Sequence, residues 1–417
     1  MNTEQAFAKM IKDANQKSAS MLIERCEKTQ ENPYGIRPVE YIAPDELVVV
    51  GLPGTVSTKE NLHACNGILK NITNFIQNHP KLQGIKVRPV MAVCEFGKYF
   101  DEDTAKHLML LEQNDPKKAA ELLQSLPLAT QQELMMPGYV KDIYNAVLEA
   151  RLSANNGTVR LPQAQALRNI RKTIFVPYCW GGYTVLKLET LMQKEMSQLN
   201  YDQASIDHIT SQMLSVAFSP SCPIGINKSR MVSFSSASDI NTKHNNYAKE
   251  YLNMQPCSCP DFGYLWWDSK EGNIFYCAQF NKNGVEGNPR QSIAIKIDSW
   301  EDLMKPLPEE EKKNSLSEHD FIGFTPHNMM SNAAKKIQYF AQNVLVNGIR
   351  HAAKLPQTGY KDLPNTRRLA ANTPKDHWDL FQAYRLGLAL KINIQKYGKE
   401  KILKDSYAAN VQFVKFD

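Results

Sequence analysis

The stretch from Lys172 to Glu195, KTIFVPYCWGGYTVLKLETLMQKE, indicates how the centre of the chain folds. It begins with an apolar run of β-branched and aromatic residues, Ile174 to Val176, which is typical of a buried strand. Apolar residues then recur at helical spacing from Val185 to Met192, which predicts a helix. Cys179 lies between the two, so we expect it at a tight turn that joins a strand to a helix.

Such a turn has a chemical use. A nucleophile on a sharp strand-to-helix turn has its side chain lifted out of the sheet, and the backbone N–H of the next residue points at the same place. The turn needs a small residue on its crowded side, and Gly181 supplies one two positions after Cys179. The alternative is a buried structural cysteine before a glycine turn, because cysteine is among the most often buried residues.

The segment Tyr178-Cys-Trp-Gly-Gly182 resembles the nucleophile elbow of dienelactone hydrolases, which are α/β-hydrolases with cysteine in the pattern Gly-Tyr-Cys-x-Gly-Gly. Pro177 stands where that pattern has glycine. The resemblance implies an α/β fold with a mostly parallel sheet flanked by helices. It also implies a Cys179 thiol that attacks an ester, lactone or thioester, with the N–H of Trp180 as one oxyanion donor.

A second glycine-containing loop precedes this elbow in the chain. Glu46 to Val50 is a strong candidate for a buried strand, and the loop Gly51-Leu-Pro-Gly54 follows it before a helix with apolar spacing from Leu62 to Ile76. The loop lacks both glycine-rich nucleotide-binding patterns, so we predict no cofactor. In α/β-hydrolases such a loop supplies an oxyanion donor, and because Pro53 has no N–H, that donor is expected at Leu52 or Gly54. A plain connecting loop is the alternative.

Composition bounds the class of protein. The 417 residues are 42% hydrophobic and 22% charged, as in an ordinary globular protein, and the net charge of +6 is spread along the chain, so we predict no nucleic-acid partner. No apolar run approaches the roughly 18 residues of a membrane span. The N-terminus has no apolar signal-peptide core, which favours a cytoplasmic location, with export by a route that needs no such signal left open.

The pattern of elements predicts three parts, with one insertion and one extension of the sheet edge in the second part. Residues 1–44 are expected to form a helical segment and a linker, 45–348 an α/β core, and 349–417 a helical extension. Within the core we expect a helical insertion at about 98–171 and an antiparallel extension of the sheet edge at about 261–298.

Two further residues complete a candidate triad. Asp239 follows a predicted strand, Met231 to Ser235, and His327 lies in a loop before a predicted helix. Cys179, Asp239 and His327 have the order nucleophile, acid, base that the α/β-hydrolase resemblance implies. In such a triad the imidazole takes the proton of the thiol, and the carboxylate holds the imidazole in place. The competing bases and acids are His244, His319, Asp261 and Asp320.

Cysteine spacing gives a weaker signal for metal. Cys257-Ser-Cys259, with Cys222 and Cys277 elsewhere, offers four thiolates, but structural zinc sites usually show two pairs with two to four residues between the cysteines. We therefore predict reduced structural cysteines and no metal.

The leading hypothesis is a hydrolase of an ester, lactone or thioester, with a small-molecule or acyl substrate and an acyl-enzyme on Cys179. The second hypothesis is a hydrolase-like scaffold without catalysis, an interaction or effector protein that binds a protein partner through its insertion and its C-terminal extension. Pro177 favours the second, as does the absence of evident early strands in residues 1–44. Peptidase or acyltransferase chemistry on the same residues is a third possibility.

Overall fold

The computed structural model divides the chain into two compact units. The first comprises Met1–Ser215 and Pro220–Pro223, and the second comprises Val216–Ser219 and Ile224–Asp417. The described residues are 3–14, 17–30, 32–54, 61–101, 103–105, 107–108, 111, 115–218, 220, 229–236, 262–268, 273–279, 292–296, 342, 345–346, 348–355 and 411–415.

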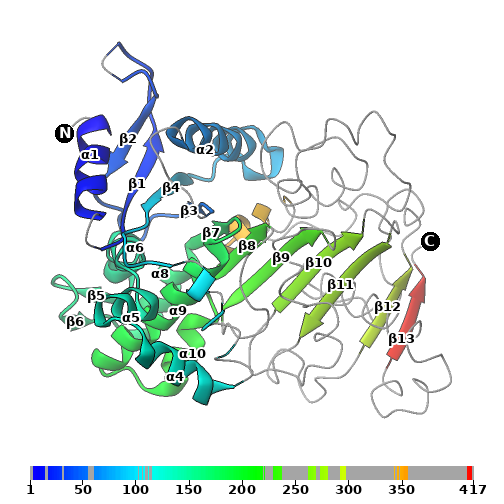
Figure 1. Ribbon diagram of the computed structural model, residues 1–417. Coiled ribbons are helices and arrows are strands. Elements are labelled where there is room, and N and C mark those ends of the chain that lie inside the picture. The colour runs from blue at the N-terminus through cyan, green and yellow to red at the C-terminus, as the bar shows by residue number, and fades with distance from the viewer. Residues whose placement is uncertain are drawn as a thin grey trace. The chain divides into compact units, whose positions relative to one another are not determined.

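A mixed sheet of six strands, most of them parallel, forms the centre of the first unit, which includes the first two residues of its last strand, β8 (Figure 1). Its order is β8-β7-β3-β4-β1-β2. Neighbouring strands from β8 to β4 run parallel, while β1 is antiparallel to both β4 and β2. The α/β class expected from the sequence is thus confirmed. The strands are β1 Ala19–Arg25, β2 Ile36–Val39, β3 Val48–Leu52, β4 Arg88–Glu95, β7 Thr173–Pro177 and β8 Leu214–Phe218.

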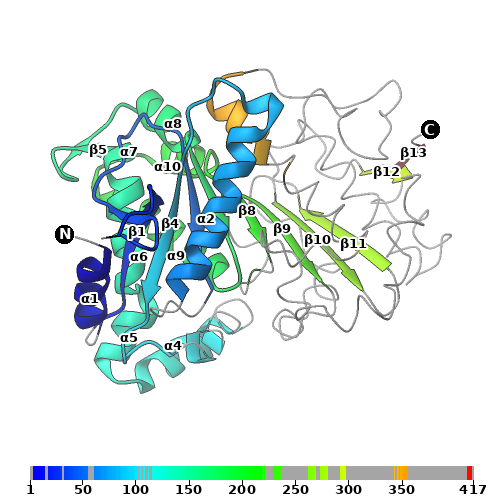
Figure 2. The same ribbon diagram turned by 90° about the horizontal axis from the view of Figure 1, so that it is seen from above.

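Helices cover both faces of this sheet. On one face α1 (Thr3–Ala14) and α2 (Asn61–Asn78) bury Phe7, Met10 and Leu69 against Ile23 of β1 and its neighbours. On the other face lie α6 (Gly138–Tyr144) and α9 (Gly181–Gln198), which contact each other, and the Ser20 hydroxyl of β1 donates to the Tyr139 carbonyl of α6. Figure 2 shows α2 lying over the parallel strands and α1 beside β1.

Shorter elements occupy the insertion between β4 and β7. They are the helices α4 Pro116–Ser125, α5 Leu128–Met135, α7 Ala150–Leu152 and α8 Gln163–Arg171, a π-helical turn Asn145–Glu149, and the hairpin strands β5 Ser153–Ala154 and β6 Val159–Arg160. A 3₁₀ turn, Pro80–Leu82, follows α2, and α10 Gln203–Thr210 precedes β8. Helices therefore make up most of the elements in the segment that was predicted as a helical insertion.

The N-terminal prediction was wrong in part. Helix α1 is present, but Met21, Leu22 and Ile23, which belong to the part predicted to be a helical segment and a linker, lie in strand β1. Both Leu22 and Ile23 are buried, on opposite faces, so β1 has no polar alternation to distinguish it from a helix. The early strands that the prediction lacked in residues 1–44 are β1 and β2.

The second unit contains a three-stranded arrangement and a separate strand pair. Strand β10 (Phe262–Asp268) runs parallel to β9 (Arg230–Ser236) and antiparallel to β11 (Asn273–Gln279), which confirms the predicted hairpin. The third strand of the expected antiparallel extension, β12 (Ser292–Lys296), pairs in parallel with β13 (Val411–Lys415) instead. The prediction of a helical extension was therefore wrong at 411–415, where Val411, Phe413 and Val414 favour a strand.

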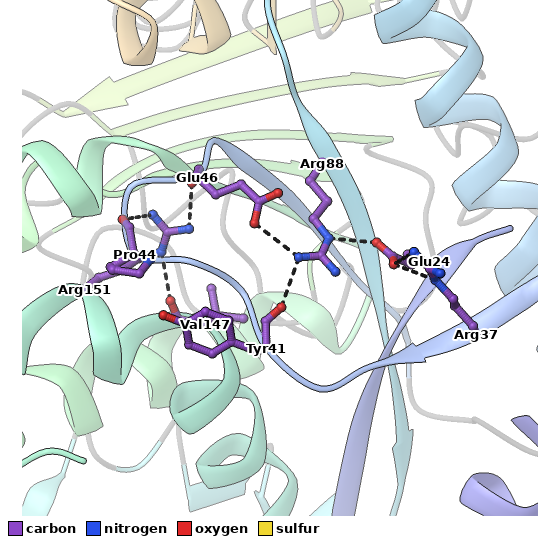
Figure 3. Close-up of polar contacts among 8 residues, drawn as sticks. All are labelled: Glu24, Arg37, Tyr41, Pro44, Glu46, Arg88, Val147 and Arg151. Carbon is purple, nitrogen blue, oxygen red and sulfur yellow. Dashed lines mark hydrogen bonds and ion pairs between the residues drawn. The ribbon is translucent and has the colours of Figure 1, made fainter. Parts of the chain in front are cut away.

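A buried arginine fixes the chain before β3 (Figure 3). Arg151 has no exposed surface, and its guanidinium donates to the carbonyls of Val147, Pro44, Asn169 and Glu46 at 2.8 to 3.0 Å. Burial lowers its pKa to about 10, and nearby acidic groups oppose that shift. The side chain thereby joins the loop that enters β3 to the insertion helices α7 and α8.

A second polar network joins the strands on the other side of that loop. Glu24 of β1 accepts from Arg37 of β2 at 2.8 Å and from Arg88 of β4 at 2.7 Å, and Arg88 also reaches Glu46 at 3.2 Å. Burial acts to raise the pKa of Glu24, but the bonds from Arg88 and Arg37 outweigh it and the pKa is lowered. Within the described part of the chain, no helix is both long and apolar enough to cross a membrane.

Replacing Arg151 by methionine should destabilise the protein by about 3 kcal/mol or more, because four carbonyls lose their donor in a buried site. Urea unfolding measures the change. The matched control is Arg168→Met on the exposed side of α8, which should stay within about 0.5 kcal/mol of the wild type. Equal changes in the free energy of unfolding for the two variants would show that the hydrogen bonds from Arg151 to the four carbonyls do not stabilise the fold.

Replacing Glu24 by glutamine should cost stability at neutral pH and progressively less in acid. A carboxyl whose folded pKa lies below the reference of 4.5 stabilises the fold above that pH, and the contribution is lost as the pH falls through the folded pKa. Denaturation at a series of pH values from 7 downward, comparing Glu24→Gln with wild type, measures the difference. A difference that stays constant down to about pH 2 would contradict this account.

Candidate active site

The turn after β7 has the geometry that the sequence predicted. Strand β7 ends at Pro177 and α9 begins at Gly181, with Cys179 between them. The φ angle of Cys179 is 50°, in the left-handed region that residues other than glycine seldom adopt. The N–H of Gly181 donates to the Tyr178 carbonyl at 2.8 Å, and that of Gly182 to the Cys179 carbonyl at 3.1 Å. Backbone strain of this kind is concentrated at functional sites in proteins.

Close packing against β3 explains why glycine follows the turn. A Cβ atom at Gly181 would lie 2.6 Å from the carbonyl oxygen of Leu52, closer than real Cβ atoms approach. The same carbonyl accepts from the N–H of Tyr178 at 2.9 Å. Pro177 pairs with Leu52 in the strand register but has no N–H to donate. The hydrogen bond from the Tyr178 N–H to the Leu52 carbonyl maintains the contact with β3 at the next residue. Proline is therefore compatible with this turn.

The loop after β3 lies beside the thiol, as the oxyanion prediction requires. A Cβ atom built on Gly54 would be 3.2 Å from the Cβ of Cys179 and 3.6 Å from its sulfur. Leu52 is buried and Trp180 has no exposed surface, whereas Cys179 is partly exposed. Of the three predicted oxyanion residues, Gly54 and Trp180 therefore lie next to Cys179, and Leu52 contacts the neighbouring Tyr178.

The strand order places this turn where open α/β sheets bind ligands. From β3 the chain continues to β4 on one side and later returns to β7 on the other side of β3. Ligands bind outside the carboxyl ends of the strands at such a switch point, where connections leave in opposite directions. Cys179 and Gly54 follow the carboxyl ends of the two strands involved.

The insertion covers the turn with apolar side chains. Trp180 stacks on Tyr183 with ring centroids 4.4 Å apart, and Phe100 meets Trp180 edge to face at 5.6 Å. The Trp180 indole N–H donates to the Tyr139 hydroxyl at 3.1 Å. Cys179 packs against this cluster, whose other members are Ala105, Leu108, Leu122, Leu123, Leu126, Leu134 and Phe96. The surroundings of the thiol are therefore mostly apolar and aromatic.

The structure describes the burial of three other cysteine thiols. Cys65 and Cys94 are buried, and burial raises the pKa of Cys65 to about 12 and that of Cys94 further. Cys26 is partly exposed, and its sulfur accepts from the Asn32 amide at 3.1 Å. Because the thiolate is the nucleophile, Cys65 and Cys94 are poor candidates for chemistry at neutral pH.

The other members of the predicted triad lie outside the described residues. These are Asp239 and His327, together with the competing residues His244, His319, Asp261 and Asp320 and the cysteines Cys222, Cys257 and Cys259. Cys277 lies in β11. Within the described ranges no group of three or more histidine, cysteine, aspartate or glutamate residues is placed to hold a metal ion.

Sequence reasoning missed Glu95. It is the last residue of β4, at the same edge of the sheet as the turn. Its Oε2 atom is buried and has no hydrogen-bond partner among the residues that the structure describes, and burial raises its pKa. The available signal was a carboxylate directly after the apolar run that ends at Cys94.

No model of a known protein family matches the chain. No curated protein is significantly similar to it. The geometry of the turn at Cys179 is therefore the basis for the function proposed below.

Replacing Gly181 by alanine should destabilise the fold by about 2 kcal/mol or more, because the new methyl group meets the Leu52 carbonyl. Thermal or urea unfolding measures the effect. The control is Gly67→Ala in α2, where a Cβ atom meets nothing within 4 Å, and a gain of about 0.5–1 kcal/mol is expected. A neutral Gly181→Ala variant would show that the turn does not need the close approach.

Iodoacetamide at neutral pH should modify Cys179 well before Cys65 and Cys94, because only the first of these thiols is partly exposed. Peptide mapping by mass spectrometry of the folded protein at successive times measures the order. Modification of Cys65 or Cys94 at the rate of Cys179 would contradict the burial of these two thiols.

Proposed function

We propose that this protein is a thiol-dependent hydrolase that cleaves an ester, lactone or thioester through Cys179. The observation that carries the proposal is the left-handed backbone of Cys179 on a strand-to-helix turn at the carboxyl end of β7. That geometry presents a side chain above the sheet edge and directs the next backbone N–H toward the same point. The adjacent loop at Gly54 supports it.

The proposed reaction has two steps. The Cys179 sulfur attacks the substrate carbonyl carbon, and the bond to the leaving oxygen or sulfur breaks to give a thioester on the enzyme. The N–H of Trp180 and that of Leu52 or Gly54 stabilise the negative charge on the carbonyl oxygen. His327 takes the thiol proton and passes it to the leaving group, and Asp239 orients the imidazole. Water then hydrolyses the thioester with the same base.

The cover over the turn sets a condition on this reaction. Trp180 has no exposed surface, and side chains of the insertion pack around it. Its backbone N–H therefore reaches a substrate only after those side chains move aside. We therefore assign the insertion the role of a lid. Closure over a bound substrate excludes water and strengthens the electrostatic stabilisation of the oxyanion.

The same cover favours a second candidate function. A turn that stays covered is inaccessible to substrate, and the chain would then be a hydrolase-like scaffold that acts as an interaction or effector protein. The buried state of Trp180 is the specific observation on this side. The two candidates differ in whether Cys179 ever becomes acylated.

A panel of p-nitrophenyl esters and acyl thioesters tests the proposal. We expect a burst of leaving group equal to the enzyme concentration, and a Cys179 acyl adduct by mass spectrometry. The burst should vanish in Cys179→Ala, because no nucleophile remains, and persist in the control Cys26→Ala, whose partly exposed thiol lies elsewhere.

Absence of a burst and of an adduct across the whole panel would reject the hydrolase. A burst that survives Cys179→Ala would assign the reaction to another residue. If the hydrolase is rejected and a protein partner captured by the chain is retained equally by Cys179→Ala, the scaffold function is supported.

A further inference from the structure

Glu95 is a partly buried residue with one buried carboxylate oxygen. It ends β4, and two residues earlier Val93 packs with α1 and α2, so the Glu95 side chain extends on that same face of the sheet. Its Oε2 atom is buried yet has no hydrogen-bond partner among the described residues. A buried acceptor without a donor is destabilising, which is why such groups are rare in folded proteins and each one calls for an explanation.

Strand register relates Glu95 to the turn. Strand β3 lies between β4 and β7, and Gly51 is level with Met91. Strands β4 and β7 are therefore two strand spacings apart in the sheet, about 10 Å. Glu95 and the turn with Cys179 lie at the same edge of the sheet, where the parallel strands β4 and β7 end.

We infer that Glu95 is a substrate-binding residue that pairs with a positively charged nitrogen on the acyl part of the substrate, several bonds from the carbonyl that Cys179 attacks. The inference rests on the proposed function and narrows its substrate class to cationic acyl esters or thioesters. An ionised carboxylate with a buried oxygen that has no donor is best satisfied by a cation that brings both charge and N–H donors. Burial raises the pKa of Glu95, as expected for a carboxyl group that has no cationic partner in the unliganded protein.

A matched pair of substrates tests the inference. The p-nitrophenyl esters of 6-aminohexanoic acid and of heptanoic acid have chains of equal length and differ in the terminal ammonium. The wild type should prefer the ammonium ester in kcat/KM, and Glu95→Gln should lower the ratio of the two kcat/KM values about tenfold or more, as expected for loss of one charge-assisted contact. The control Glu121→Gln, on the exposed side of α4, should keep the wild-type ratio.

An unchanged ratio in Glu95→Gln would overturn the inference while leaving the hydrolase proposal intact. If the wild type turns over neither ester, the hydrolase proposal fails and Glu95 is tested by binding instead. Hexylammonium should then raise the melting temperature of the wild type more than that of Glu95→Gln, with hexanol as the uncharged comparison. Equal shifts in the two proteins would reject a cation site at Glu95.

Discussion

The approach of the turn after β7 to the Leu52 carbonyl is the constraint on which the site depends. That single oxygen accepts from the Tyr178 N–H and lies 2.6 Å from the place where a Cβ atom at Gly181 would be. Glycine is therefore required at the start of α9, and α9 can begin directly above the end of β3. The left-handed backbone of Cys179 closes the remaining distance between strand and helix. One short contact between two strands thus fixes where the thiol stands relative to the loop at Gly54.

Strand β3 is held at its other end by a different kind of interaction. Arg151 donates to the carbonyls of Pro44 and Glu46 in the loop before the strand, and the N–H of Val48 donates to the Lys172 carbonyl just before β7. The amino ends of β3 and β7 are therefore tied together and to the insertion. Because the amino ends are fixed by polar contacts, the carboxyl ends can carry a strained turn, which costs roughly 1–3 kcal/mol.

Local signals made the turn predictable from sequence, and non-local ones did not. Cys179 and Gly181 stand between a β-rich run and a helical pattern, so strand, turn and helix were recognised together. Strand β1 is buried on both faces and resembled a helix, while β13 pairs with β12 across more than a hundred residues, which no local pattern records. The cover on Trp180 arises from tertiary packing with Tyr139, and the burial of the Glu95 Oε2 atom likewise depends on tertiary packing. The roles of Asp239 and His327 stay predictions.

The central claim is that the Cys179 sulfur forms a covalent bond with an acyl carbon while backbone N–H groups hold the carbonyl oxygen. A crystal structure of the protein after reaction with a β-lactone tests it most directly. The account predicts a thioester on Cys179 with the carbonyl oxygen directed at the N–H of Trp180 and the loop at Gly54. Electron density for the acyl group on another residue, or a carbonyl oxygen turned away from both N–H groups, would contradict it.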